Sequence, residues 1–139
     1  MRLVFLPCAA ALALAACSPP AQAPSDAPET AEVTIVVTAP TRGARVTSPL
    51  RVEGTAPGDW FFEAVFPIKL RGANGEVIAE APAQAQRDYI TEQPVPYVGE
   101  IQFEVTEETQ ATLVLEEDMP SGLPGEREIR IPVVLVPSN

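Results

Sequence analysis

Residue types that commonly carry out catalysis are scarce in this chain of 139 residues. It contains no histidine, which removes the usual general base at neutral pH and the commonest metal ligand. The two cysteines, Cys8 and Cys17, both lie near the N-terminus. The sequence has neither a glycine-rich phosphate loop nor a GxSxG motif. We therefore expect a protein that is not an enzyme and that uses no cofactor.

Carboxylates are the remaining candidates for chemistry, and they form two sequence clusters, residues 107–108 and residues 116–118. Successive residues of a strand point to opposite faces of a sheet, so neighbours within a cluster do not converge. No calcium loop of the DxDxDG type is present. The preferred interpretation is solvated loops, with calcium binding and acid–base catalysis as alternatives, and we predict no metal site.

Negative charge dominates the chain, whose formal net charge is −10. Residues 88–139 contain eleven acidic and two basic side chains, and no Lys or Arg lies between Asp88 and Glu126. This distribution argues against nucleic acid as a partner and against electrostatic docking on anionic lipid. A solvated acidic face is the simplest explanation of region 88–126. The alternative is a surface for a basic partner or for divalent cations.

The first residues resemble the signal of a bacterial lipoprotein. Arg2 precedes an apolar run over residues 3–16, which is too short to span about 30 Å of hydrocarbon comfortably. The run ends in Leu14-Ala15-Ala16-Cys17, which resembles a lipobox. This resemblance implies cleavage between Ala16 and Cys17 and acylation of Cys17. Two or three acyl chains make a stable membrane anchor.

The segment after the predicted cleavage site is expected to be a disordered tether. Residues 17–32 contain four prolines, four alanines and no large apolar side chain, so they cannot form a core. In extended polyproline geometry, at about 3.1 Å per residue, they would reach at most about 50 Å. Ser18, rather than Asp, follows Cys17, which resembles the pattern sorted to the outer membrane. We thus expect a lipid-anchored protein of the bacterial cell envelope, on the outer membrane and facing the periplasm.

Residues 33–139 have the length of one domain and a period-two pattern that predicts β-strands. The even positions of residues 60–70 are all apolar, which predicts a long strand with Trp60, Phe62 and Phe66 in the core. The other predicted strands cover residues 33–38, 50–53, 76–79, 97–106, 111–115 and 129–135. Residues 81–96 are expected to be mostly irregular, with a short strand near residues 89–90.

Several sequence signals define the expected architecture. Asn74-Gly75 predicts a hairpin, while Pro67 and Pro132 indicate strand edges or bulges. Seven or eight short strands with no convincing helix fit an all-β fold, an immunoglobulin-like antiparallel β-sandwich of about seven strands. No cysteine follows Cys17, so we expect no disulfide.

Two motifs within this domain carry a family resemblance. They are the Ser-Pro-Leu-x-Val-x-Gly run over residues 48–54 and the Trp-Phe-Phe-Glu run over residues 60–63. The domain resembles the immunoglobulin-like domain of bacterial spore germination proteins, over most of residues 33–136. The resemblance implies an exported, two-sheet domain that is often attached to envelope lipoproteins. It implies no catalytic residues.

A candidate interaction surface consists of Phe61 and Glu63, on the face of the predicted strand away from the core, and Asp59 in the turn beside them. Phe61 either contributes to an exposed apolar patch or is covered by residues 81–96. The expected function is an envelope-anchored protein-interaction or structural module, with the membrane and an unidentified envelope protein as partners. The alternative is a carbohydrate- or peptidoglycan-binding module that uses Trp60, Tyr89 and Tyr97 as a platform for sugars.

The lipobox gives a direct prediction for Cys17→Ala. Without the thiol that is acylated, the protein should remain uncleaved, carry no lipid and leave the outer-membrane fraction. Metabolic labelling with a fatty acid and membrane fractionation measure these effects, with Cys8→Ala as the matched control. Fractionation of Cys17→Ala like the wild type would contradict the anchor.

Overall fold

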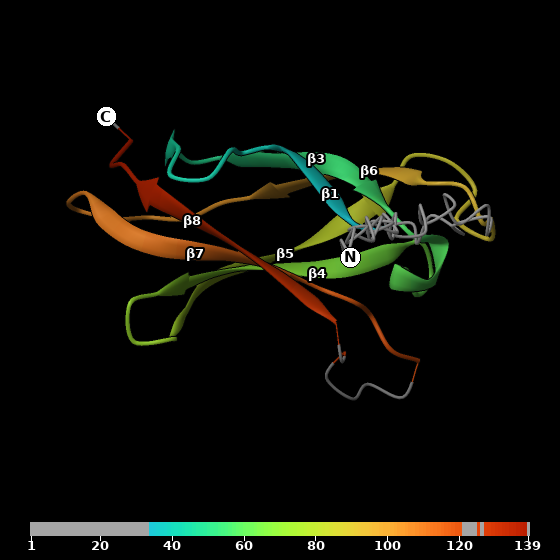
Figure 1. The fold of residues 1–139 in the computed structure, drawn as a ribbon. Coiled ribbons are helices and arrows are strands. Elements are labelled where there is room, and N and C mark those ends of the chain that lie inside the picture. Colours follow the sequence, from blue (N-terminus) through green and yellow to red (C-terminus); the bar gives the residue numbers. More distant parts are fainter. Residues whose placement is uncertain (1–33, 121–124, 126, 139) are drawn as a thin grey trace, which may run out of the picture. The chain divides into compact units, whose positions relative to one another are not determined.

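The computed structural model describes residues 34–120, 125 and 127–138, and within them eight strands and one short 3-10 helix, η1 (Figure 1). The elements are β1 Val36–Ala39, β2 Arg45–Val46, β3 Leu50–Ala56, η1 Gly58–Trp60, β4 Val65–Gly72, β5 Val77–Ala85, β6 Val95–Ile101, β7 Thr109–Glu116 and β8 Glu128–Leu135. None of the helical structure in the described residues is long and apolar enough to cross a membrane. The predicted signal peptide, Cys17 and the predicted tether lie outside the described residues.

The strands form a single sheet in the order β1-β3-β6-β5-β4-β7-β8-β2. The sheet curls so that the β1-β3-β6 part lies across from the β4-β7-β8 part, with the core between them (Figure 1). All pairs are antiparallel except β2 and β8, which pair in parallel over two residues each. The predicted immunoglobulin-like β-sandwich is thus confirmed, with this one parallel pair as an addition. The domain contains no cysteine and hence no disulfide.

The β4–β5 hairpin joins the two layers and is the hairpin predicted from Asn74-Gly75. Gly75 adopts a φ of 81°, a conformation that glycine tolerates without strain. The prediction of a short returning strand at residues 76–79 was wrong, because β5 continues to Ala85. Pro82 lies opposite Pro67, and two residues without N–H groups fit only a pair of the non-hydrogen-bonded type. The predicted strand at residues 89–90 is absent, since these residues belong to a loop.

The predicted long strand over residues 60–70 was also wrong in its first half. Phe62 and Val65 exchange two backbone hydrogen bonds, of 3.0 and 3.1 Å, around a tight turn. The two central residues, Glu63 and Ala64, have φ values of 51° and 68°. This turn reverses the chain and breaks the alternation, so Phe61 is buried and Phe62 is 37% exposed. The alternation in the sequence predicts the reverse, with Phe62 buried and Phe61 on the outer face, and is wrong for both residues.

An aromatic cluster fills the core next to this turn. The ring of Phe66 lies 5.9 Å from Trp60, 5.2 Å from Phe61 and 4.9 Å from Tyr97 between ring centroids. All three contacts are edge-on, the arrangement that aromatic quadrupoles favour. The predicted burial of Trp60 and Phe66 is therefore confirmed.

The hydroxyl of Tyr97 connects this cluster to β1. It donates a hydrogen bond of 3.0 Å to the backbone oxygen of Val36. Gly54 makes room for this contact, because a Cβ atom there would lie 1.9 Å from the same oxygen. The edge strand β1 is thus positioned by a buried phenol as well as by its ladder with β3.

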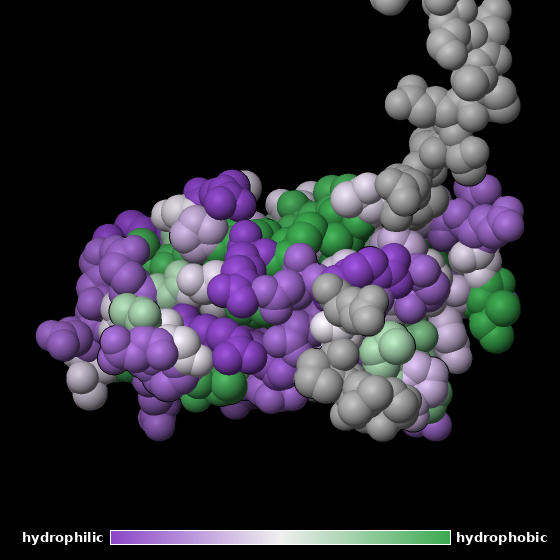
Figure 2. All heavy atoms as spheres, turned by 60° about the horizontal axis from the view of Figure 1, so that its bottom comes forward, coloured by the Kyte–Doolittle hydropathy of each residue, from purple (hydrophilic) through white to green (hydrophobic). Residues whose placement is uncertain are grey.

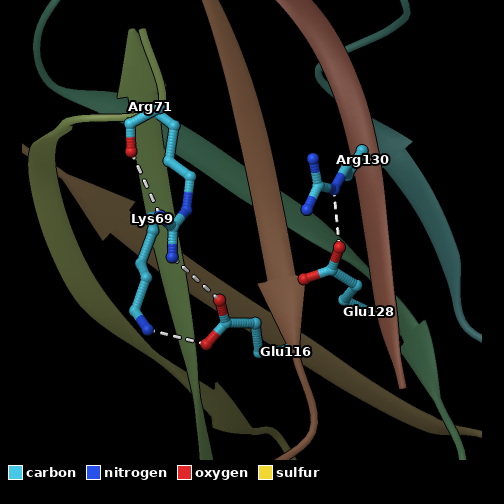
Figure 3. A network of polar contacts seen from close by, with 6 residues as sticks. Lys69, Arg71, Glu116, Glu128 and Arg130 are labelled. Atoms are coloured by element: carbon cyan, nitrogen blue, oxygen red, sulfur yellow. Dashed lines mark hydrogen bonds and ion pairs between the residues drawn. The ribbon is translucent and has the colours of Figure 1, made fainter. Parts of the chain in front are cut away.

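The outer face of β4, β7 and β8 carries a network of charged side chains (Figure 3). Lys69 and Arg71 contact Glu116 at 2.6 and 3.4 Å, and Arg130 contacts Glu128 at 2.6 Å. Val114 lies between Lys69 and Arg130 in the strand register and is fully buried. The aliphatic stems of its long neighbours account for this burial. The face turned toward the viewer in Figure 2 is accordingly mostly hydrophilic.

Tyr97 gives a pH-dependent prediction. Burial raises the pKa of its phenol, so the folded state holds the proton more tightly than the unfolded state does. The stability that this adds is complete below pH about 10 and is lost as the pH rises further through the folded-state pKa. In a Tyr89→Phe background, the tyrosinate absorbance of Tyr97 should appear only as the fold is lost. Ionisation of Tyr97 while near-ultraviolet circular dichroism is unchanged would contradict this expectation.

Candidate functional site

Three loops meet at one end of the sandwich, and we call this region the loop end (Figure 1). The first loop, residues 57–64, connects β3 to β4, and the second, residues 86–94, connects β5 to β6. The third runs from β7 to β8, and the structure describes residues 117–120, 125 and 127 of it. Loops clustered at the ends of a sandwich are the usual binding regions of immunoglobulin-like domains.

The first two loops contact each other at two places. The ring of Tyr89 lies 6.0 Å from that of Phe61. Gly58 permits the close approach, since a Cβ atom there would lie 2.1 Å from the backbone oxygen of Tyr89 and 2.7 Å from that of Thr91. The second loop therefore rests directly on the backbone of the 3-10 turn.

Arg127 ties the third loop to the first. Its Nη2 lies 2.9 Å from a carboxylate oxygen of Asp59, and its Nε lies 2.5 Å from one of Glu117. The guanidinium carbon is 5.7 Å from the ring centroid of Trp60, within the range of a cation–π contact. The backbone N–H of Asp118 also donates to the oxygen of Trp60, at 3.0 Å.

Burial and hydrogen bonding shift the pKa of the Arg127 guanidinium in opposite directions. Burial alone would lower the pKa of Arg127, but the hydrogen bonds and charges of Glu117 and Asp59 outweigh it and raise the pKa. Glu117 is 6% exposed and is the only charged residue that is buried among the described ones. Its carboxylate also accepts the backbone N–H of Arg127, at 3.2 Å. Arg127 therefore pairs with one buried carboxylate, that of Glu117, and one exposed carboxylate, that of Asp59.

A cavity of about 490 Å³ opens beside this cluster. It is lined by Thr34, Ile35, Pro57, Asp59, Trp60, Arg127, Glu128 and Ile129. Its wall is mixed. Pro57, Asp59, Trp60 and Arg127 come from the loop end, whereas Ile35 lies just before β1 and Glu128 and Ile129 belong to β8.

The second loop holds a large apolar side chain out into solvent. Ile90 is 80% exposed. Its backbone N–H donates to the carboxylate of Asp88 at 2.9 Å, and Thr91 Oγ1 accepts the backbone N–H of Gln93 at 3.1 Å. Arg87 donates to the backbone oxygen of Pro94 across the base of the loop. Local hydrogen bonds of this kind fix a turn, so Ile90 is presented on a defined support.

The predicted interaction residues Asp59, Phe61 and Glu63 all lie on the first loop, but they do not form one exposed surface. Asp59 is exposed and paired with Arg127, and Glu63 is exposed at the tight turn. Phe61 is buried beneath Tyr89, which belongs to residues 81–96. The alternative in which Phe61 contributes to an exposed apolar patch is therefore wrong. The alternative in which residues 81–96 cover Phe61 is correct.

Sequence reasoning missed Phe62 and Ile90, the large apolar side chains that are exposed at the loop end. Phe62 was hidden because Glu63 and Ala64 are not residues that signal a turn with positive φ. Ile90 carried a usable signal, since Asp88, Thr91 and Glu92 surround it with polar residues, but the short strand predicted at residues 89–90 obscured that signal.

The acidic clusters have structural partners. Glu108 pairs with Arg45 at 2.6 Å, and this contact lowers the pKa of the carboxyl. Glu116 pairs with Lys69 and Arg71, and Glu117 pairs with Arg127. In the described part of the chain, no three acidic side chains converge in a group that could hold a metal ion.

The platform proposed for sugar binding does not form. Trp60 is 3% exposed and Tyr97 is 1% exposed, and Tyr89 is half-buried against Phe61. Binding of sugar rings by stacking needs exposed aromatic faces. These three side chains serve the core and the second loop instead.

Comparison with known proteins gives one match. The family described as the immunoglobulin-like domain of bacterial spore germination matches residues 34–123. Nothing matches significantly among curated proteins or among solved structures. The matched residues contain the first two loops and the beginning of the third.

Arg127→Gln tests the electrostatic role of this cluster. The substitution leaves the buried carboxylate of Glu117 without its cationic partner, and we expect a loss of about 1–3 kcal/mol of unfolding free energy. Arg130→Gln is the matched control, because the Arg130–Glu128 pair is exposed and should contribute less than about 1 kcal/mol. Urea unfolding of the variants measures both. Equal effects of the two substitutions would contradict the assignment.

Proposed function

The chain belongs to the family of immunoglobulin-like domains of bacterial spore germination, and on this premise we propose a non-catalytic protein-interaction module of the bacterial envelope. The module is anchored through lipid on Cys17, which is supported by the Leu14-Ala15-Ala16-Cys17 motif after an apolar run. Ser18 supports attachment to the outer membrane on its periplasmic side. The Pro-rich residues 17–32 form a tether that lets the module contact partners at a distance from the membrane.

The observation that carries the interaction function is the exposure of Ile90 on a well-supported loop. Binding costs less when the contacting residues are already held in place, because little conformational entropy is lost. Large side chains that enter a pocket of the partner contribute most of the affinity of an interface. Ile90 has this form, and Phe62 adds a second apolar contact at the loop end.

Charge at the loop end favours a partner with basic groups around its pocket. Asp88 and Glu92 flank Ile90 in the second loop, and no basic residue occurs between Asp88 and Glu126. Complementary charge around an apolar contact raises the association rate and excludes wrong partners. A protein surface with an apolar pocket and a rim of Lys or Arg fits both features.

Ile90→Asp tests this function in the lipidated full-length protein. A photo-reactive amino acid at position 92 captures the partner in intact cells, and mass spectrometry identifies it. Binding of the purified partner should weaken at least about tenfold in Ile90→Asp, because the anchoring side chain is lost. It should also weaken as salt is raised.

Val77→Asp is the matched control for this experiment. Val77 is also an exposed aliphatic residue, at 48%, but it lies beside the β4–β5 hairpin turn at the other end of the domain. This variant should bind the partner like the wild type. Equal binding by wild type and Ile90→Asp, or equal loss in both variants, would contradict the proposed surface.

A further inference from the structure

Among the described residues, no strand pairs with the outer backbone edge of the first half of β8. Pro132 accepts a hydrogen bond from the N–H of Gly43 at 2.7 Å, and Val134 donates one to Ala44 at 2.9 Å. Backbone groups of alternate residues point to the same side of a strand, so those of Glu128 and Arg130 point to this side as well. The short strand β2 pairs only with Val134 and Leu135. Within the described residues no strand covers residues 128–131 on this side.

Side-chain contacts occupy only part of this edge. Arg42 donates from Nη1 to the backbone oxygen of Arg130 at 3.3 Å, and both residues are exposed. This long side chain can be displaced, unlike a paired strand. Within the described residues, no hydrogen bond uses the outward N–H groups of Glu128 and Arg130 or the carbonyl of Glu128, so a backbone partner could bind them.

A groove runs along the same edge, between β8 and β1. The 490 Å³ cavity lies at the loop end, and a second cavity of about 370 Å³ continues from it. Glu128 and Ile129 line both cavities. The apolar side chains along the groove are Ile35 and Val37 from the β1 side and Ile129 and Ile131 from β8. Their spacing of two residues matches the inward side chains of an added strand.

We propose that this groove binds an extended segment of a partner protein, which adds an antiparallel strand to the edge of β8. Backbone hydrogen bonds to Glu128 and Arg130 hold the segment, and its apolar side chains enter the groove. This is the β-augmentation mode of peptide recognition. The site differs from the loop-end surface around Ile90, and the two can be tested separately.

The charges of β8 determine which sequence the groove selects. In antiparallel register centred on Ile129, one residue of the segment lies opposite Arg130 and another lies opposite Glu128. Opposite charges in directly facing positions stabilise a pair of strands, and like charges destabilise it. The preferred segment therefore has the pattern acidic, apolar, basic in its own N-to-C direction, with further apolar residues on each side. Pro132 has no N–H to donate and marks the end of the site.

Two peptides of identical composition serve as probes, Val-Glu-Val-Lys-Val and Val-Lys-Val-Glu-Val, both acetylated and amidated. The first places opposite charges across from Arg130 and Glu128, and the second places like charges there. We expect the first to bind at least about fivefold more tightly, measured by the fluorescence of Trp60, which lines the groove. Amide exchange at Glu128 and Arg130 should slow on binding. Equal binding of the two peptides, or no protection of these amides, would overturn the proposal.

The double variant Glu128→Arg with Arg130→Glu gives the sharpest control, since it exchanges the two charges without changing composition. Its preference between the peptides should be reversed. Glu128→Pro removes one outward N–H, as Pro132 does naturally, and should weaken both peptides. Urea unfolding checks that the variants are folded, and Ile90→Asp should bind the peptides like the wild type.

Sedimentation of the full chain without peptide tests whether a second copy of the chain, rather than a partner segment, occupies the edge of β8. A monomer across the concentrations used in the titrations is the expected result. A dimer that Glu128→Pro dissociates would show that a second copy occupies the edge, and it would overturn the assignment to a partner segment.

Discussion

The fully buried ring of Phe66 contacts three other aromatic rings, and these contacts connect nearly every part of the domain. Trp60 and Phe61 bring the first loop into the core, and Phe61 in turn supports the second loop through Tyr89. Tyr97 extends the cluster to the edge strand β1. Because the domain has no disulfide, this cluster and the aliphatic rows around it must position both the strands and the loop end.

The sequence was informative wherever one residue pattern persisted. The alternation at residues 97–106 predicted a buried row, which the structure contains as far as Phe103, although β6 itself ends at Ile101. The alternation at residues 111–115 and the Asn74-Gly75 pair correctly predicted β7 and the hairpin between the layers. The alternation mispredicted Phe61 and Phe62, because the tight turn with positive φ at Glu63 and Ala64 interrupts the strand. Phe61 therefore faces the core and Phe62 faces solvent. Glu and Ala seldom adopt this conformation, so these two residues gave no sign of the turn in the sequence.

Most basic side chains in the described part of the domain form ion pairs with carboxylates. The sequence showed an excess of acidic residues after Asp88, but it did not show that Glu117 is buried, since its partner Arg127 lies ten residues further along the chain. Pairing of this kind depends on the spacing between β7 and β8. The groove beside Glu128 could not be predicted from the sequence either, because it depends on how the strands are arranged. In the sheet, β1 is the first strand and β2 is the last.

Thr34 lines the same cavity as Asp59, Trp60 and Arg127, so the chain enters the domain at the loop end. If the partner binds the loops as proposed, entry and binding lie at the same end of the domain, and this has a mechanical consequence. A pulling force applied through the residues before Thr34, and resisted by a partner on the loops, passes only through that end. Such a force would not act on the β4–β5 hairpin turn or on the C-terminal part of β8. The first strand to be loaded would be β1, which pairs with β3. The hydrogen bond from Tyr97 to Val36 lies where that tension enters the sheet.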